Sequence, residues 1–425
     1  MRPALEGLVA DAQAAPSLDT RTRNKIQQRI ALGAQALVDI IEPSEGFVGC
    51  DFGTSSTKTV VRWPYDAAEG SAFAVPVPSA WCSGGIPQLW PTAVYFNPAT
   101  KLFAAIPGQG YHAITGFKSA LLDKRSHRMC GHGLTNADAG VAFLAQYLAY
   151  VLGVVREKAS DKKVSLVNFG VPVATLSESD VTREFRRIIE AALSLIGKAE
   201  ALSFDEVRGA LAKPEAGPLE ATYHAELSGA IAGYCSAPRH RQGAHMIIDC
   251  GSATLDIASF ALTDSQWPIG IYAAQVEPLG ADACRRYIDA GASDDECRKA
   301  ARYQEAEVCH ATYQLQSGQY AAHEGRFGYQ VILVGGGVSS SVHQPLLTKM
   351  EEAFDLKFYR PRLSPTLQRD RASQDIRLIL ADGLARDPIE LREVVMPLDR
   401  ENHHASSGNM GNARGTNWEV TKDQV

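Results

Sequence analysis

The chain has 425 residues and a formal net charge of −6, with 45% hydrophobic and 21% charged residues. This composition is typical of a soluble protein with two or three domains, each with its own core. The mild acidity and the lack of a basic stripe with interleaved aromatic residues argue against a nucleic-acid-binding protein.

The eight cysteines are scattered along the chain and form no Cys-x-x-Cys pair. This spacing is typical of reduced thiols in a cytoplasmic protein rather than of a disulfide framework or a zinc site. Residues 1–20 contain no apolar stretch behind a charged start, which predicts no signal peptide. We also expect no membrane partner, because no apolar run reaches the length needed to span a bilayer.

The N-terminal segment, residues 1–45, is polar and alanine-rich. Its apolar residues follow helical spacing from Ile26 to Ile40, and Pro43 closes the segment. We expect a helical extension that lies outside the catalytic core.

The first motif is a β-hairpin at residues 51–58, entered from the apolar run 47–50. A glycine in such a turn permits positive φ and lets an anion approach the main chain. The aspartate at the strand end, Asp51, can hold the water shell of a cation. The tip is therefore predicted to bind phosphate through Gly53, Thr54, Ser55, Ser56 and Lys58.

Strand and helix signals then alternate. Residues 46–115 have β signals broken by proline and glycine, and helical spacing follows at 139–158. An apolar strand at 164–173 leads into a second helix at 179–196. This alternation favours an α/β protein.

A second hairpin at residues 249–256 has the same design as the first. It is entered from residues 246–248, begins with Asp249 and has hydroxyls at its tip. Two such tips facing each other would hold a polyphosphate and its magnesium from both sides. The corresponding phosphate-binding residues are Gly251, Ser252 and Thr254.

The rest of the chain continues the alternation. Helices are expected at 282–290 and 295–315, a strand at 330–334 and a further helix from about residue 344, and a strand or helix start closes the core at 376–386. Between that strand and helix, three consecutive glycines would let a flat base or sugar lie against bare backbone. They are Gly335, Gly336 and Gly337.

Two common nucleotide-binding classes are excluded. Asp51, Phe52 and Gly53 spell the magnesium-binding triplet of protein kinases, but no His-Arg-Asp catalytic loop exists. The chain also has no Gly-x-x-x-x-Gly-Lys-Ser/Thr loop.

The two hairpins and the glycine segment at 331–341, in this order and spacing, resemble the actin-like ATPase superfamily. The resemblance is closest to the nucleotide-binding domain of the heat-shock protein 70 family. It implies an α/β, two-lobed actin-like ATPase fold of duplicated ribonuclease-H-like domains, with a nucleotide cleft between the lobes. The lobes would span 46–235 and 236–395, with the final helix packing back on the first lobe and a disordered tail at 396–425.

The resemblance also implies cofactors and roles. ATP or ADP would bind with Mg²⁺, and Asp51 and Asp249 would hold the metal mostly through water. By position in the family, Lys118 corresponds to the γ-phosphate lysine, and Glu226 would orient the attacking water. The implied catalytic set is Lys118, Glu226, Asp249 and Thr254, and Glu307 corresponds to a residue of the adenine-contacting helix.

The sequence departs from the heat-shock protein 70 pattern in three respects. The two outer subdomains are shortened, few residues follow the last core element, and Ser252 and Ala253 stand where the family prefers glycines. We therefore expect no peptide-binding domain. The prediction is a cytoplasmic, Mg-dependent, slowly hydrolysing ATPase that acts as a chaperone-like, nucleotide-switched regulator or assembly factor with a protein partner.

Three alternatives stay open at this point. The same fold supports actin-like filament proteins, whose head-to-tail contacts propagate. It also supports small-molecule kinases for sugars or carboxylates. The departure at Ser252 and Ala253 leaves open a sensor that binds ATP without hydrolysing it.

Overall fold

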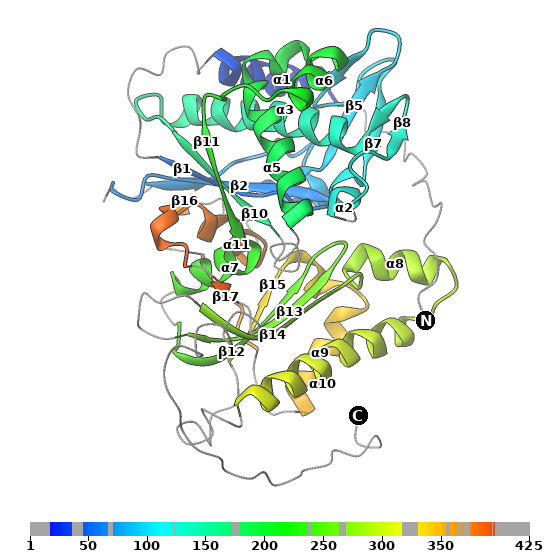
Figure 1. Cartoon of the computed structure of the whole chain (residues 1–425), viewed down its shortest axis with the longest axis vertical. Helices are drawn as coiled ribbons and strands as arrows, with labels where there is room; N and C mark the ends of the chain where they lie inside the picture. Colours follow the sequence, from blue (N-terminus) through cyan, green and yellow to red (C-terminus); the bar gives the residue numbers. More distant parts are fainter. Residues whose placement is uncertain are drawn as a thin grey trace.

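The protein consists of two α/β lobes stacked along the long axis of the molecule (Figure 1). The computed structural model describes residues 18–35, 46–66, 71–122, 124–171, 179–236, 240–262, 269–316, 330–353, 358–363, 367–368, 375–392 and 394–395. The predictions for residues 1–17, 36–45 and 396–425, and for the end of the strand predicted at 164–173, lie outside the described residues.

The first lobe is built on a seven-stranded sheet. Its strand order is β11-β10-β1-β2-β3-β16, and β4 pairs with β2 off this path. β1 is antiparallel to β2 and parallel to β10, and β11 continues the parallel side. The strands are β1 (Phe47–Asp51), β2 (Ser56–Arg62), β3 (Ala72–Ala74), β4 (Trp90–Pro91), β10 (Leu166–Val171), β11 (Glu220–Ala225) and β16 (Leu367–Gln368).

Helices and two small sheets complete this lobe. A capping box between Thr135 and Asp138 begins α3. The helices are α1 (Thr20–Gln35), α2 (Phe117–Leu122), α3 (Asn136–Lys158), α5 (Ser179–Ser194) and α6 (Phe204–Ala212), with short 3₁₀ turns at Ser83–Gly85 and Ile196–Ala201. The small sheets contain β5 (Ala93–Asn97), β6 (Leu102–Ala104), β7 (His112–Thr115), β8 (Met129–Gly131) and β9 (Leu134–Thr135).

The length and composition of α3 differ from the expectation of no bilayer-length apolar run. Among the described helices, it alone is long and apolar enough to cross a membrane. Its apolar window is 100% buried inside the protein. The helix forms the centre of the first lobe's core, so burial against protein accounts for its composition.

The helix α1 is part of the first lobe and not the separate extension that the sequence predicted. Ile26 and Ile30 belong to the lobe's main apolar cluster. The buried Arg29 donates to the Glu157 carboxylate at 2.7 Å and to the Tyr150 hydroxyl at 2.7 Å, both on α3. The apolar face of α1 therefore packs on α3, and an ion pair fixes its position.

The second lobe repeats the plan of the first with a five-stranded sheet. Its order is β15-β12-β13-β14-β17, again with an antiparallel hairpin, a third antiparallel strand and a parallel strand on the other side. The strands are β12 (Gly243–Cys250), β13 (Leu255–Leu262), β14 (Ile269–Glu277), β15 (Gln330–Val334) and β17 (Val394–Val395). The helical elements are α8 (Ala281–Asp289), α9 (Asp294–Gln316), α10 (His343–Ala353) and 3₁₀ turns at Gly336–Ser339 and Pro388–Glu390.

The shared strand order identifies the architecture. In each lobe the first strand (β1 or β12) pairs antiparallel with the next strand (β2 or β13) and, on its other side, parallel with a later one (β10 or β15). Two copies of this ribonuclease-H-like arrangement make the two-lobed actin-like ATPase fold. The fold class predicted from the sequence is therefore confirmed.

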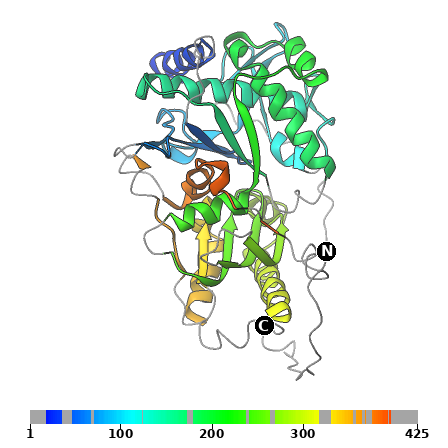
Figure 2. The ribbon, with the colours of Figure 1, turned by 60° about the vertical axis from the view of Figure 1, so that its left-hand side comes forward.

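Two helices, α7 (Glu226–Cys235) and α11 (Asp375–Leu384), lie between the sheets (Figure 2). α7 shares an apolar cluster with the second sheet through Leu227, Ile231 and Tyr234. α11 instead packs against β1 and β2 of the first sheet. The closing element, predicted only as a strand or helix start, is thus a helix that joins the lobes.

The two helices approach so closely that glycine is required at their contact. A Cβ atom built on Gly383 of α11 would lie 1.8 Å from the carbonyl oxygen of Gly229 on α7. No side chain can occupy that space without separating the helices.

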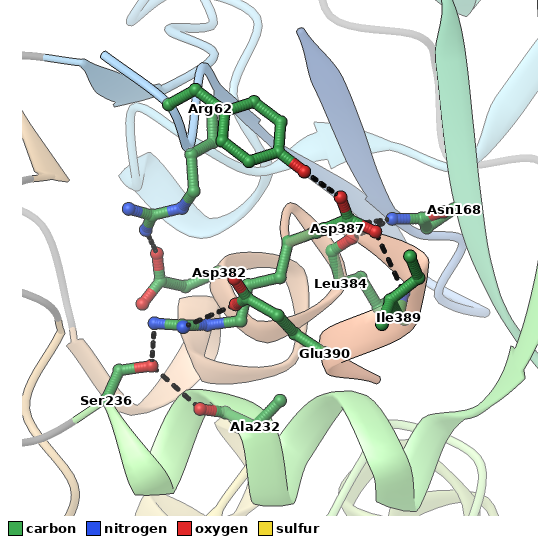
Figure 3. Close-up of polar contacts among 11 residues, drawn as sticks. Arg62, Asn168, Ala232, Ser236, Asp382, Leu384, Asp387, Ile389 and Glu390 are labelled. Carbon is green, nitrogen blue, oxygen red and sulfur yellow. Dashed lines mark hydrogen bonds and ion pairs between the residues drawn. The ribbon is translucent and has the colours of Figure 1, made fainter. Parts of the chain in front are cut away.

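Polar contacts fix α11 to both lobes (Figure 3). Arg62 of β2 forms a buried ion pair with Asp382. Asn168 of β10 donates to the carbonyl oxygens of Leu384 and Arg386 at 2.6 and 2.8 Å. The Arg386 side chain donates to Ser236, directly after α7. The helix end is thereby tied to the first sheet and to α7 together.

We predict that Gly383→Ala lowers the free energy of unfolding by roughly 2 kcal/mol or more, because the new methyl group forces α7 and α11 apart. Urea unfolding followed by circular dichroism measures this. The matched control is Gly209→Ala on α6, where an added Cβ meets no atom within 4 Å. The free energy of unfolding of that control should be unchanged or should rise by up to about 1 kcal/mol, because alanine has a higher helix propensity than glycine. Equal stability of the two variants would contradict the close contact.

Candidate functional site

A cavity of about 290 Å³ lies between the lobes, where β1 and β12 end. Residues from both hairpins, the glycine run, α7, α8 and α11 form its walls. All the sequence-predicted site residues except Glu307 line it, namely Asp51, Gly53, Thr54, Ser55, Ser56, Lys58, Lys118, Glu226, Asp249, Gly251, Ser252, Thr254, Gly335, Gly336 and Gly337.

The first hairpin presents its tip to the cavity with its backbone fixed from behind. Thr92 donates its hydroxyl to the Gly53 carbonyl at 2.8 Å and its amide to the Ser55 carbonyl at 3.0 Å. Within the described residues, the amides of Thr54 and Ser55 have no protein acceptor. Amides left over in this way suit an anion.

Gly53 is needed in this turn for a different reason than predicted. Its φ is not among the positive values of the described glycines. A Cβ atom at Gly53 would instead lie 2.2 Å from the Ser56 carbonyl oxygen. The tight closure of the turn, not a left-handed backbone, excludes a side chain.

The second hairpin directs its carbonyl groups to α8. The amides of Ala281 and Asp282 donate to the carbonyls of Gly251 and Ser252 at 3.0 and 2.9 Å. The amides of Ser252 and Ala253 find no acceptor in the part of the chain that the structure describes. With its carbonyls occupied, this tip also offers N–H groups.

The two hairpins differ in one charged position. In the first, Asp51 faces Lys58 across the strands, and Lys58 Nζ donates to Asp51 Oδ2 at 2.6 Å. In the second, the equivalent register pair is Asp249 and Asp256. Two carboxylates therefore stand where the first lobe has an ion pair.

This pairing perturbs both acids. The pKa of Asp249 is raised to about 7, first by burial and then by the charges of Glu226 and Asp51. Burial likewise raises the pKa of Asp256 well above its ordinary value, followed by the charges of Asp249 and Glu226. The Oδ1 atom of Asp256 is buried and has no hydrogen-bond partner.

Lys118 is the buried cation of the site. Its ammonium group donates to Glu226 Oε1 at 3.1 Å, and its side chain is only 5% exposed. Burial lowers the pKa of Lys118, but the carboxylates of Glu226 and Asp51 outweigh this effect and raise it overall. The lysine therefore stays charged although it is buried.

The glycine run lines the cavity and packs closely on its neighbours. Gly335 has φ +85°, and a Cβ atom there would lie 2.3 Å from Asp249 Oδ1. A Cβ at Gly337 would lie 2.5 Å from Cys250 Sγ. At Gly336, the guanidinium carbon of Arg377 would be 3.0 Å away. Close packing thus explains why Gly335 and Gly337 are glycines, and the contact of the run with a base stays a prediction.

Glu307 is the predicted site residue that the structure keeps out of the cavity. It is exposed on α9 and does not line the cavity. Its assignment came from a blurred helix signature. α9 instead presents the buried Gln304, which donates to the Leu255 carbonyl at 2.7 Å.

Several lining residues escaped the sequence reasoning. Asp256 had a signal, because it follows Asp249 by the same interval that separates Lys58 from Asp51. Arg377 had none, since it reaches the cavity only through the return of α11 to the lobe interface. Further lining residues that were not predicted are Leu89, Ala281, Asp282, Ile376 and Leu380.

Direct metal ligation is not evident in the described residues, which contain no group of three or more His, Cys, Asp or Glu placed to hold an ion. The water-mediated magnesium predicted at Asp51 and Asp249 is a different arrangement and stays a prediction.

Comparison with known proteins gives little guidance. No protein-family model matches the chain, and no curated protein matches it. Solved structures do match, among them the crystal structure of MreB5 of Spiroplasma citri bound to ADP. That match has a TM-score of 0.41 and 13% identity, and covers 80% of this chain and 94% of that chain. A similarity this low says nothing about a ligand here, and the resemblance to heat-shock protein 70 stays a prediction.

We predict that the nucleotide-free protein, in a chelator, loses stability relative to Asp249→Asn as pH rises from about 4 to about 7. Over this window folded Asp249 holds a proton that the unfolded chain, with the ordinary pKa of 3.8, has released. The difference in the free energy of unfolding between the variant and the wild type should grow by at most about 1.4 kcal/mol per pH unit and level off above pH 7. Urea unfolding across pH measures it.

The control for this prediction is Asp289→Asn, at an exposed position on α8. It should follow the wild type at every pH. A constant gap between Asp249→Asn and the wild type would show that the Asp249 pKa is not raised.

Proposed function

We propose that the chain binds ATP and ADP with Mg²⁺ between its lobes and hydrolyses ATP slowly. Closing and opening of the lobes would then signal to a protein partner in the cytoplasm. The observation that supports this proposal is the single cavity lined by two hairpin tips from different lobes, each with unused amide groups. No nucleic-acid or membrane partner is part of the proposal.

The charges of the cavity fit a magnesium ion. Five lining acids (Asp51, Glu226, Asp249, Asp256 and Asp282) face three lining bases (Lys58, Lys118 and Arg377), and 3 − 5 gives a formal charge of −2. A triphosphate adds more negative charge, so a divalent cation is needed to make binding favourable. Asp51, Asp249 and the orphaned oxygen of Asp256 would hold its water shell. When bound, the ion neutralises charge on the phosphate oxygens.

The side chains of the cavity then have separate roles. Lys118, held by Glu226, would donate to the γ-phosphate and stabilise the charge that spreads there. Glu226 and Asp249 would orient the attacking water. A carboxylate within reach of that water can accept its proton. Thr254, from the second tip, would contact the phosphates.

We predict that Lys118→Met and Asp249→Asn each lower the ATP turnover number by at least about 100-fold. The affinity for Mg-ATP should change by less than about tenfold, since many other groups hold the phosphates. Phosphate release and calorimetry measure the two quantities. The control is Lys299→Met, at a 76% exposed side chain paired with Asp295 on α9. Unchanged turnover in both site variants would refute these roles.

A second measurement separates the alternatives that share this fold. For a regulator we expect no rise in light scattering, and no sedimenting polymer, when Mg-ATP is added. A filament protein would show both, because head-to-tail contacts propagate. A small-molecule kinase would release ADP only when a hydroxyl substrate is supplied, and a sensor would bind ATP without releasing phosphate.

A further inference from the structure

Arg377 occupies the wall of the cavity formed by the first turn of α11 and the glycine run. Its Nη2 atom reaches the Gly336 carbonyl at only 3.4 Å, which makes a weak hydrogen bond. The guanidinium carbon lies 3.0 Å from the position of a Cβ on Gly336. The planar group thus rests against the bare backbone of Gly336.

The other two cations of the cavity are already paired. Lys58 is bound to Asp51 and Lys118 to Glu226. Within the described residues, no carboxylate forms an ion pair with Arg377. Burial lowers its pKa and no neighbouring charge offsets this effect. A half-buried guanidinium with one weak protein contact has N–H donors left to meet a ligand in the cavity.

The surroundings of Arg377 differ from those of the hairpin tips. The same helix face places Ile376 and Leu380 in the cavity wall, and Val334 adjoins them. The unused amides and both lysines belong instead to the hairpin side. Apolar side chains beside a planar cation suit an aromatic ring, whereas phosphates are served by the tips.

We infer that Arg377 is a specificity-determining residue that binds the nucleoside end of the ligand, with its guanidinium plane stacked on the base. This inference rests on the proposed nucleotide binding and adds the group that distinguishes a nucleotide from a bare polyphosphate. A guanidinium can stack on a base face, and a lysine ammonium cannot reproduce that contact.

The test compares Mg-ATP, Mg-ADP and inorganic Mg-tripolyphosphate by calorimetry on the full chain. For Arg377→Met we expect about tenfold weaker binding of both nucleotides and an unchanged affinity for tripolyphosphate. Arg377→Lys should fall close to the methionine variant. The control Arg360→Met, at a half-exposed side chain paired with Glu351, should match the wild type for all three ligands. Thermal unfolding establishes that each variant is folded.

The outcomes separate the inference from the function on which it rests. Equal nucleotide affinity in Arg377→Met and the wild type overturns the inference alone. The inference is also overturned if Arg377→Met loses as much affinity for tripolyphosphate as for ATP, because Arg377 would then bind phosphate. If the wild type binds ATP no more tightly than tripolyphosphate, the phosphate site is supported and the nucleoside contact is refuted. Binding of neither ligand overturns the proposed function and the inference together.

Discussion

The candidate site depends on an excess of buried acidic side chains between the two hairpins. Asp249 and Asp256 face each other across β12 and β13, where the first lobe has the ion pair of Asp51 and Lys58. Burying like charges side by side works against folding, and the raised pKa values of both acids express this cost. Lys118 offsets only part of it, since Glu226 already engages its ammonium group. Local arrangements that oppose stability in this way are typical of sites that recruit a ligand.

The scaffold around these charges is rigid where the lobes meet. Close backbone contact between Gly383 and Gly229 leaves no space for a side chain between α7 and α11, and the buried pair of Arg62 and Asp382 holds α11 on the first sheet. α11 packs on β1 and β2 of the first sheet, and both helices share an apolar cluster with the second sheet. The crossing therefore contacts both lobes. Each member of this buried ion pair needs the other, because removing one would leave an uncompensated buried charge that costs about 3–5 kcal/mol.

Sequence reasoning reached the parts of the fold that local patterns specify. The two hairpins, the apolar strand β15 and the helix α3 follow from turn glycines, alternation and helical spacing, and the strand order confirmed the predicted fold class. It failed where the cause is tertiary. The packing of α1 on α3 depends on Arg29 meeting Glu157, which is 128 residues away. Gly335 and Gly337 are fixed by contact with the second hairpin, which no local pattern reveals. Glu307 was misplaced because a helical signature does not say which face of the helix meets the cavity.

A single helix connects the two features that matter most. α11 carries Ile376 and Arg377 at its start, in the cavity wall, and Asp382 and Gly383 at its end, in the crossing with α7. Arg377 and Gly383 are six positions apart (383 − 377) in this ten-residue helix, which is short enough to behave as one stiff body. On the proposed nucleotide binding, a ligand that drew the two hairpins together would also act on this helix, since its start lines the cavity and its end contacts both lobes. We therefore propose α11 as the element that would link occupancy of the cavity to the angle between the lobes.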